Sequence, residues 1–162
     1  MEVMNRREVL LTAAAAAIAG ALPRTRLLAD APPAQTIIDV GPKSDYGKDG
    51  ITPTWSKTNK IIIIRNAGEI YASSSICTHK GCIVRPNPTN DGFTCPCHHA
   101  TYDITGAVTH RPAKIALERY AISVDANDHI IVDKSKPFPQ DQWTDPASFI
   151  SVPEPQTQPS AG

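Results

Sequence analysis

The chain has 162 residues, with 16 Lys and Arg against 16 Asp and Glu and a formal net charge of zero. Its length suits one domain with appended segments. The balanced charge, without a basic stripe, excludes an electrostatic case for nucleic-acid binding. The apolar fraction of 41% is ordinary for a globular protein, and the 15 prolines fall mostly outside the middle of the chain.

Residues 1–31 have the pattern of a targeting segment. Arg6 and Arg7 precede an apolar run, 9–22, whose 14 residues match a signal peptide and fall short of the ~20 needed to span a bilayer. The arginine pair resembles a twin-arginine signal, which exports folded proteins and implies the periplasmic side of a bacterial inner membrane. An ordinary secretory signal or an amphipathic helix is the alternative. The segment is either cleaved, for example after Ala31, or retained as a membrane anchor.

Residues 36–133 predict an all-β domain of antiparallel sheets. Short segments rich in β-branched residues are separated by turn residues, and none has the length and period of an amphipathic helix. The second segment has four consecutive isoleucines, which favours a strand buried on both faces. The predicted strands are 36–40, 60–65, 69–72, 120–124 and 129–132, and the last four form two hairpins.

From residue 134 onward the composition changes. Six of the residues in 134–162 are prolines, and the last ten are rich in Pro, Gln, Ser and Thr. This composition predicts a tail that is partly extended and has a disordered end. Phe138, Trp143, Phe149 and Ile150 are candidates for fastening its first part to the domain.

All four cysteines and three of the five histidines lie within residues 77–103. They form two half-sites, Cys77, His79 and Cys82 in the first and Cys95, Cys97 and His98 in the second. A structural zinc takes four ligands, so six candidates are too many for one ion. Two structural disulfides would leave the adjacent histidines unexplained. A 2Fe–2S cluster held by two cysteines and two histidines uses both residue types.

The motif C-x-H-x15-C-x2-H resembles the Rieske family, and the resemblance covers roughly residues 60–133. It implies a Rieske-type β domain with a small cluster-binding subdomain of two loops and one 2Fe–2S cluster. Cys77 and Cys95 would hold one iron, and His79 and His98 the other. Imidazoles in place of thiolates make the cluster less negative, which gives potentials of about −150 to +300 mV.

The two remaining cysteines place the resemblance within the family. Cys82 and Cys97 match an extra pair that forms a disulfide between the cluster loops in Rieske subunits of quinol-oxidising cytochrome complexes. Such a bridge suits an exported protein. The short gap between the half-sites most resembles the cytochrome bf type.

The second loop reads CPCHHATY over residues 95–102, where high-potential members of the family read CPCHGSxY. Tyr102 is kept at the position whose hydroxyl donates to a cluster cysteine in the family. Ala100 stands in place of a serine that donates to a bridging sulfide, which predicts a lower potential because hydrogen bonds to sulfur stabilise the reduced cluster. His99 stands in place of a glycine, so a side chain must tolerate any positive φ there.

The segment GAVTHRPAK occupies the position of the family's proline loop, which shields the cluster. Pro112 is kept, whereas Arg111 and Lys114 replace a glycine and a proline. These two cations belong either to a docking surface or to a solvated loop. His110 and His129 are predicted to be ordinary surface or strand residues.

The resemblance implies an electron-transfer subunit of an oxidoreductase rather than an independent catalyst. The primary prediction is that the protein is the iron–sulfur component of a quinol:cytochrome c reductase. Its partners would be quinol, a cytochrome b and a cytochrome c or another acceptor. His79 and His98 would then form its proton-coupled electron-transfer face. A soluble periplasmic Rieske carrier, or a small subunit of another periplasmic oxidoreductase, is the alternative.

Overall fold

The computed structural model describes residues 36–153, which form an all-β domain as predicted. The strands are β1 Ile37–Pro42, β2 Gly50–Thr52, β3 Ile61–Asn66, β4 Glu69–Ser74, β5 Arg85–Pro86, β6 Gly92–Thr94, β7 Thr101–Asp103, β8 Val108–His110, β9 Arg119–Val124, β10 His129–Phe138 and β11 Ile150–Ser151. Short 3-10 turns are η1 Lys43–Tyr46, η2 Gln140–Gln142 and η3 Pro146–Ser148. Within 36–153, none of the helical turns is long or apolar enough to cross a bilayer. The predicted targeting segment lies outside the described residues.

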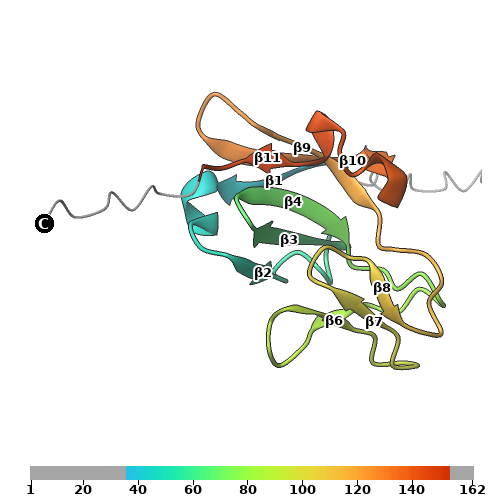
Figure 1. Ribbon diagram of the computed structural model, residues 1–162. Coiled ribbons are helices and arrows are strands. Elements are labelled where there is room, and N and C mark those ends of the chain that lie inside the picture. Colours follow the sequence, from blue (N-terminus) through green and yellow to red (C-terminus); the bar gives the residue numbers. More distant parts are fainter. Residues whose placement is uncertain (1–35, 154–162) are drawn as a thin grey trace, which may run out of the picture. The chain divides into compact units, whose positions relative to one another are not determined.

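Two antiparallel sheets make up the domain (Figure 1). The larger is seven-stranded, with the order β1-β10-β9-β4-β3-β2, and β11 pairs with β4. The smaller sheet, β5-β6-β7-β8, is inserted in the chain between β4 and β9. This insertion contains both Cys/His half-sites, so it is the cluster-binding subdomain that the sequence predicted.

The central hairpin joins β3 to β4 by a tight turn. Asn66 pairs with Glu69, and the two residues between them, Ala67 and Gly68, have φ angles of 51° and 78°. Positive φ at both central residues is the requirement of the turn type whose twist matches that of the strands. The Asp49 carboxylate accepts a hydrogen bond of 3.1 Å from the Ala67 amide and so supports the turn from a neighbouring loop.

Strand β3 lies between two hydrophobic cores. Ile61 and Ile63 belong to a first core, whereas Ile62 and Ile64 belong to a second, and all four are fully buried. Successive side chains of a strand point to opposite faces, so each core receives every second isoleucine. The prediction of a strand buried on both faces is therefore confirmed.

The predicted boundary at Asp133 falls inside β10, which continues to Phe138. Pairing of β10 with β1 ends at Asp133, and a register shift follows before Pro137 pairs with Tyr120 of β9. The proline lies where β10 has a partner on one side only, a position that tolerates a missing amide hydrogen. The proline-rich composition predicted a tail because proline has no backbone amide hydrogen to donate to a neighbouring strand. At Pro137 no such donor is needed, because β10 has no second partner strand there. Residues 154–162, the predicted disordered end, lie outside the described residues.

Trp143 attaches the C-terminal segment to the domain through a buried arginine. The guanidinium of Arg119 in β9 lies 3.7 Å from the ring centre of Tyr71 and 4.5 Å from that of Trp143. Only 5% of Arg119 is exposed, and burial holds the pKa of its guanidinium below its usual value. A desolvated cation between aromatic faces gains ~2 kcal/mol or more from such contacts. Phe149 and Ile150 pack at the edges of the two cores, so three of the four predicted anchors contact the domain interior.

Candidate metal centre

Two loops of the small subdomain share one hydrogen-bond pattern. In the first, the Cys77 amide donates to the Cys82 carbonyl at 2.7 Å, and the Gly81 amide donates back to the Cys77 carbonyl at 2.9 Å. In the second, the Cys95 amide donates to the Ala100 carbonyl at 2.8 Å, and the His99 amide donates back to the Cys95 carbonyl at 3.0 Å. Each loop is thus closed over the same number of residues by bonds to and from its first cysteine.

The fifth residue of each loop has a left-handed backbone. Gly81 has a φ of 76° and His99 a φ of 58°. Glycine adopts this conformation without steric cost, whereas another residue loses roughly 1–2 kcal/mol. At His99 a side chain therefore tolerates a positive φ, as the sequence required, and the shared loop pattern identifies Gly81 as its counterpart.

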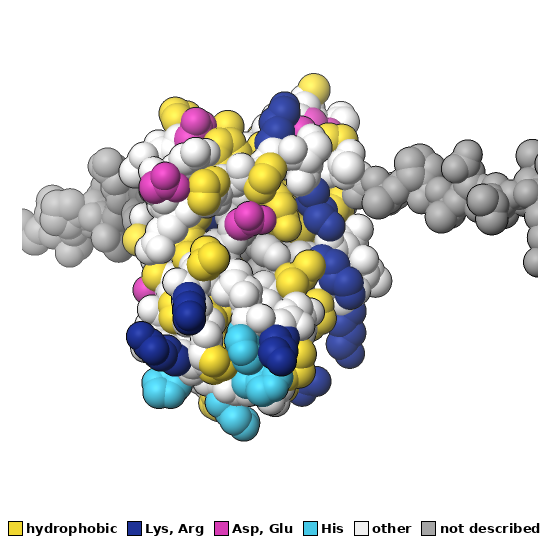
Figure 2. Space-filling view, turned by 90° about the vertical axis from the view of Figure 1, so that its right-hand side faces the viewer, with side chains coloured by type: hydrophobic (Ala, Val, Ile, Leu, Met, Phe, Trp, Pro, Cys, Tyr) yellow, Lys and Arg dark blue, Asp and Glu magenta, His cyan; other side chains and the backbone are white. Residues whose placement is uncertain are grey.

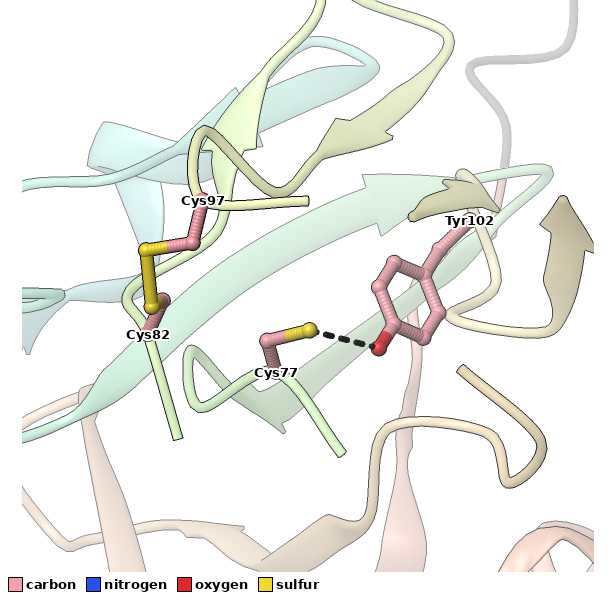
Figure 3. The surroundings of a disulfide bond; sticks show 4 residues. All are labelled: Cys77, Cys82, Cys97 and Tyr102. Atoms are coloured by element: carbon pink, nitrogen blue, oxygen red, sulfur yellow. Dashed lines mark hydrogen bonds between the residues drawn. A yellow bond between two sulfur atoms is a disulfide. The ribbon is translucent and has the colours of Figure 1, made fainter. Parts of the chain in front are cut away.

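A disulfide links the two loops and leaves two cysteines free. Cys82 and Cys97 are bonded, with their Cα atoms 6.5 Å apart. The free cysteines, Cys77 and Cys95, are both 1% exposed. The pairing agrees with the one implied by the resemblance, and it crosslinks the first loop to the second (Figure 3).

Three sulfurs, those of Cys82, Cys95 and Cys97, lie within 4.8 Å of one another. This group is not a three-thiolate metal site, because two of its members are joined as a disulfide and offer no thiolate. It does place the free thiol of Cys95 directly beside the bridge between the loops.

The imidazoles of His79 and His98 come together at the ends of the two loops. Their ring centres are 4.8 Å apart and their planes are inclined by 88°. His98 is exposed, whereas Nδ1 of His79 is buried and has no hydrogen-bond partner within residues 36–153. Burial, followed by the neighbouring His98 and Lys80, holds the pKa of His79 below its usual value. A buried ring nitrogen without a partner is costly unless it binds a metal or another group.

The side chain of Tyr102 in β7 points its hydroxyl at Cys77 of the first loop (Figure 3). Its hydroxyl oxygen lies 3.3 Å from Sγ of Cys77, and it accepts a hydrogen bond of 3.2 Å from the Thr78 amide. Burial raises the pKa of the Cys77 thiol, but the hydrogen bonds of Tyr102 and of the His79 and Lys80 amides outweigh it and hold this pKa below its ordinary value. Burial, with the Cys77 contact, raises the pKa of Tyr102 to about 12. The tyrosine is thus a neutral donor beside a thiol whose ionisation its hydrogen bond favours.

Thr78 is a residue of this site that the sequence analysis missed. Its hydroxyl lies 3.1 Å from the Tyr102 hydroxyl and donates to the carbonyl of Ile115 at 2.6 Å. Thr78 therefore connects the first loop to the segment that precedes β9. The motif treats this position as the unspecified residue between Cys77 and His79, so no local signal marked it.

The remaining predicted residues surround the two loops. Ala100 is fully buried in the second core, and Pro112 is partly buried next to Ala113 of the same core. Arg111 and Lys114 are exposed and line a hollow of about 470 Å³ together with His110.

His129 lies elsewhere, at the start of β10 in the large sheet. Its Nδ1 lies 2.9 Å from the carboxylate of Asp39. It is thus a strand residue outside the loops, as predicted.

These residues suit an iron–sulfur cluster with mixed ligands. Two buried free thiols, two adjacent imidazoles and an orphaned buried ring nitrogen converge where the two loops meet, and a hydroxyl is directed at one of the sulfurs. The class defined by this fold and site is a small β protein with a Cys/His metal centre.

The family model of the Rieske [2Fe-2S] domain matches residues 36–121, and the chain belongs to this family. Its cofactor is accordingly one 2Fe–2S cluster of the Rieske type. The structural zinc and the second structural disulfide considered from the sequence are thereby set aside.

The chain is similar to iron–sulfur subunits of cytochrome b6-f complexes. It is 32% identical to that of Chlorobaculum tepidum over an alignment of 99 residues that covers 58% of this chain and 55% of that protein. Over 75 residues it is 41% identical to that of Synechococcus sp. strain WH7803, covering 46% of this chain and 37% of that protein. The chain therefore spans only about 37 to 55% of the length of these relatives.

Among solved structures, the chain is similar to the cyanobacterial plasma membrane Rieske protein PetC3 from Synechocystis PCC 6803. The sequence identity is 32% and the TM-score 0.47, with 59% of this chain and 97% of that one covered.

Proposed function

We propose that the protein transfers single electrons through its cluster, with Cys77 and Cys95 as ligands of one iron and His79 and His98 as ligands of the other. The observation that carries this assignment is the buried Nδ1 of His79, which has no partner within residues 36–153 and lies beside the ring of His98. The two free thiols supply two further metal-binding groups in the same loops. When bound, the cluster takes up and releases one electron at a time.

Each side chain of the site has a separate task in this proposal. Burial keeps Cys77 and Cys95 away from water, and the hydrogen bond with Tyr102 favours the thiolate of Cys77. The disulfide holds the two loops together independently of the metal. His98 is exposed, so an electron donor or acceptor can approach the cluster at this imidazole.

Within the cell, we propose that the protein is the iron–sulfur component of a quinol:cytochrome c oxidoreductase of the bc or bf type. The similarity to cytochrome b6-f iron–sulfur subunits and the disulfide between the loops support this role. Its partners would then be quinol with a cytochrome b, and a cytochrome c or another electron acceptor. The second candidate is a soluble periplasmic carrier or a small subunit of another periplasmic oxidoreductase, which the shortness of the apolar run in 9–22 favours.

We also propose that the chain is exported by a twin-arginine route and works on the periplasmic side of the inner membrane. The disulfide supports an oxidising compartment, and a protein loaded with its cluster before export needs a route for folded proteins.

Spectroscopy on the reduced holoprotein tests the ligand assignment. We expect iron and sulfide in equal amounts, and couplings to two imidazole nitrogens in pulsed electron paramagnetic resonance. Replacing His98 with Cys should remove one nitrogen coupling, whereas the matched change His110→Cys should leave both couplings intact. A His98→Cys protein that keeps two nitrogen couplings would refute the assignment.

Purification from the native membrane tests the cellular role. Co-purification with a cytochrome b, and reduction of the cluster by a quinol in that preparation, are the expected results. A protein recovered only as a soluble monomer, which a quinol does not reduce, would exclude the quinol-oxidising role and leave the carrier.

A further inference from the structure

Exposed cations surround the candidate metal centre. Lys80 lies within the first loop, between His79 and Gly81. Lys57 and Arg85 line a hollow of about 920 Å³ together with the disulfide, and Arg111 and Lys114 line the hollow beside His110. We call Lys57, Lys80, Arg85, Arg111 and Lys114 the basic rim, and all five are exposed.

No acidic side chain of the described domain neutralises the basic rim. The ion pairs within residues 36–153 join other residues: Lys43 with Asp128, Arg65 with Asp49, His129 with Asp39, and Lys136 with Asp133.

The acids of the subdomain are engaged locally. Asp91 accepts hydrogen bonds from Asn87 and Thr89. Asp103 accepts them from Thr105 and from the Ala107 amide. Neither carboxylate is directed at a cation of the rim.

Charge is distributed unevenly between the small subdomain and the C-terminal part of the domain. Residues 77–115 contain four Lys and Arg against two Asp, and four of the five histidines of the chain. Residues 116–153 contain three Lys and Arg against six Asp and Glu. In Figure 2, histidines gather at one end of the face with Lys and Arg beside them, and the acidic side chains lie away from that end.

This polarity determines which partners can approach the cluster. Electrons pass efficiently only over short distances, so a partner must cover the exposed His98 and hence the rim around it. Like charges across an interface cost several kcal/mol and slow association, whereas opposite charges accelerate it by about 10- to 1,000-fold. The unpaired cations therefore select against a basic contact surface.

We propose that the basic rim is a docking surface for an electron-transfer protein whose redox centre is surrounded by acidic side chains. This inference rests on the proposed electron-transfer function and adds the charge of the partner to it. The contact is transient, because exposed charge pairs contribute to association rate more than to affinity.

The experiment measures electron transfer from the reduced holoprotein to a probe of either charge. The probes are a basic cytochrome c and the same cytochrome with its lysines succinylated, which makes it acidic. At an ionic strength of about 0.01 M the screening length is ~30 Å, and we expect the succinylated probe to react at least 10 times faster than the unmodified one. The difference should vanish at about 1 M, where the screening length is ~3 Å.

Charge-neutralising variants locate the effect. At low ionic strength, Arg111→Gln with Lys114→Gln should slow the reaction with the acidic probe several-fold. At about 1 M salt, where the charges are screened, the rate should be unchanged. The control, Lys48→Gln with Lys136→Gln, removes the same formal charge outside the small subdomain, from the loop before β2 and from β10. It should change neither rate beyond the effect of the lowered net charge, which is common to both variants. An unmodified cytochrome that reacts as fast as the succinylated one, or a control that matches the rim variant, would overturn the proposal.

Two further readouts separate other outcomes. The cluster spectrum and midpoint potential of each variant show whether the centre is intact, and a protein that assembles no cluster refutes the proposed function rather than the docking surface. Retention on phosphatidylglycerol vesicles at about 0.1 M salt, lost in the rim variant, would assign the rim to a lipid surface and overturn the protein partner.

Discussion

The hydroxyl of Tyr102 lies 3.3 Å from the sulfur of Cys77, a residue 25 positions earlier in the chain. A donor at this sulfur stabilises the more negative, reduced cluster. We expect Tyr102→Phe to lower the midpoint potential. A bond that favours the reduced state by about 1 kcal/mol corresponds to ~40 mV for one electron. Redox titration of the holoprotein measures the shift.

Tyr71 provides the control for this change. It is buried in the same core, but its hydroxyl donates to the Ile104 carbonyl at 3.0 Å. Tyr71→Phe therefore removes a buried hydroxyl without removing a bond to sulfur. Equal potential shifts in the Tyr71 and Tyr102 variants would contradict the role of Tyr102.

Ala100 gives the opposite test, in which a donor is added. We expect Ala100→Ser to raise the midpoint potential, because the family's serine at this position donates to a bridging sulfide. Since Ala100 is fully buried, a hydroxyl without a partner would cost about 1–3 kcal/mol of stability. Ala72→Ser in the first core is the matched control, with a loss of stability and no shift of potential. An unchanged or lowered potential in the Ala100 variant would show that the missing serine does not tune the cluster.

The disulfide should contribute to stability through the loop that it closes. Cys82 and Cys97 are 15 residues apart, and closing such a loop in the unfolded chain is worth about 3 kcal/mol. We expect Cys82→Ser with Cys97→Ser to lower the free energy of unfolding of the holoprotein by about this amount in urea titrations. If the unfolding curves of the wild type and the double variant coincide, the disulfide does not contribute this stability.

His99 should tolerate glycine better than a β-branched residue. Its φ of 58° suits glycine, whereas valine in this region is a steric outlier. We expect His99→Gly to change the free energy of unfolding by less than about 1 kcal/mol, and His99→Val to lower it by more. Two variants of equal stability would mean that the loop relaxes away from this backbone conformation.

His129 should make stability depend on pH. Its hydrogen bond with Asp39, followed by the charges of Asp39, Asp125 and Asp45, raises the pKa of the imidazole, and the same hydrogen bond lowers the pKa of Asp39. The contribution of the histidine is therefore complete below its unfolded pKa of about 6.5 and is lost as pH rises through the higher folded value.

The measurement compares the wild type with His129→Gln by urea unfolding. The stability difference should be larger at a pH of about 5.5, above the unfolded pKa of Asp39, than at a pH of about 8.5. Asp39→Asn should give the same pattern. A difference that grows at the higher pH would have the wrong sign for this pair.

Much of the fold and the family could be predicted from the sequence because each depends on local patterns. The isoleucine run and its turn define the central hairpin, and the spacing of Cys and His defines the family. The pairing of Cys82 with Cys97 came from the resemblance, since spacing alone allows other pairings.

What the sequence did not reveal depends on contacts between distant segments. Thr78 joins Tyr102 to Ile115, and the motif marks none of these contacts. No sequence pattern singled out Arg119, whose guanidinium contacts the rings of Tyr71 and Trp143 in the structure. The extension of β10 was missed because proline content was taken as the end of the domain, although the strand has a single partner there.

Four identical side chains in β3 have a consequence for how this sheet aligns. A slip of one residue would exchange the faces of the strand, but Ile61 to Ile64 would still supply isoleucine to both cores. The four isoleucines therefore do not encode the register of the strand by themselves. That information lies in residues around the run: the buried Arg65, which donates to the Tyr46 carbonyl at 2.9 Å, the Ala67-Gly68 turn and the unlike residues of β4.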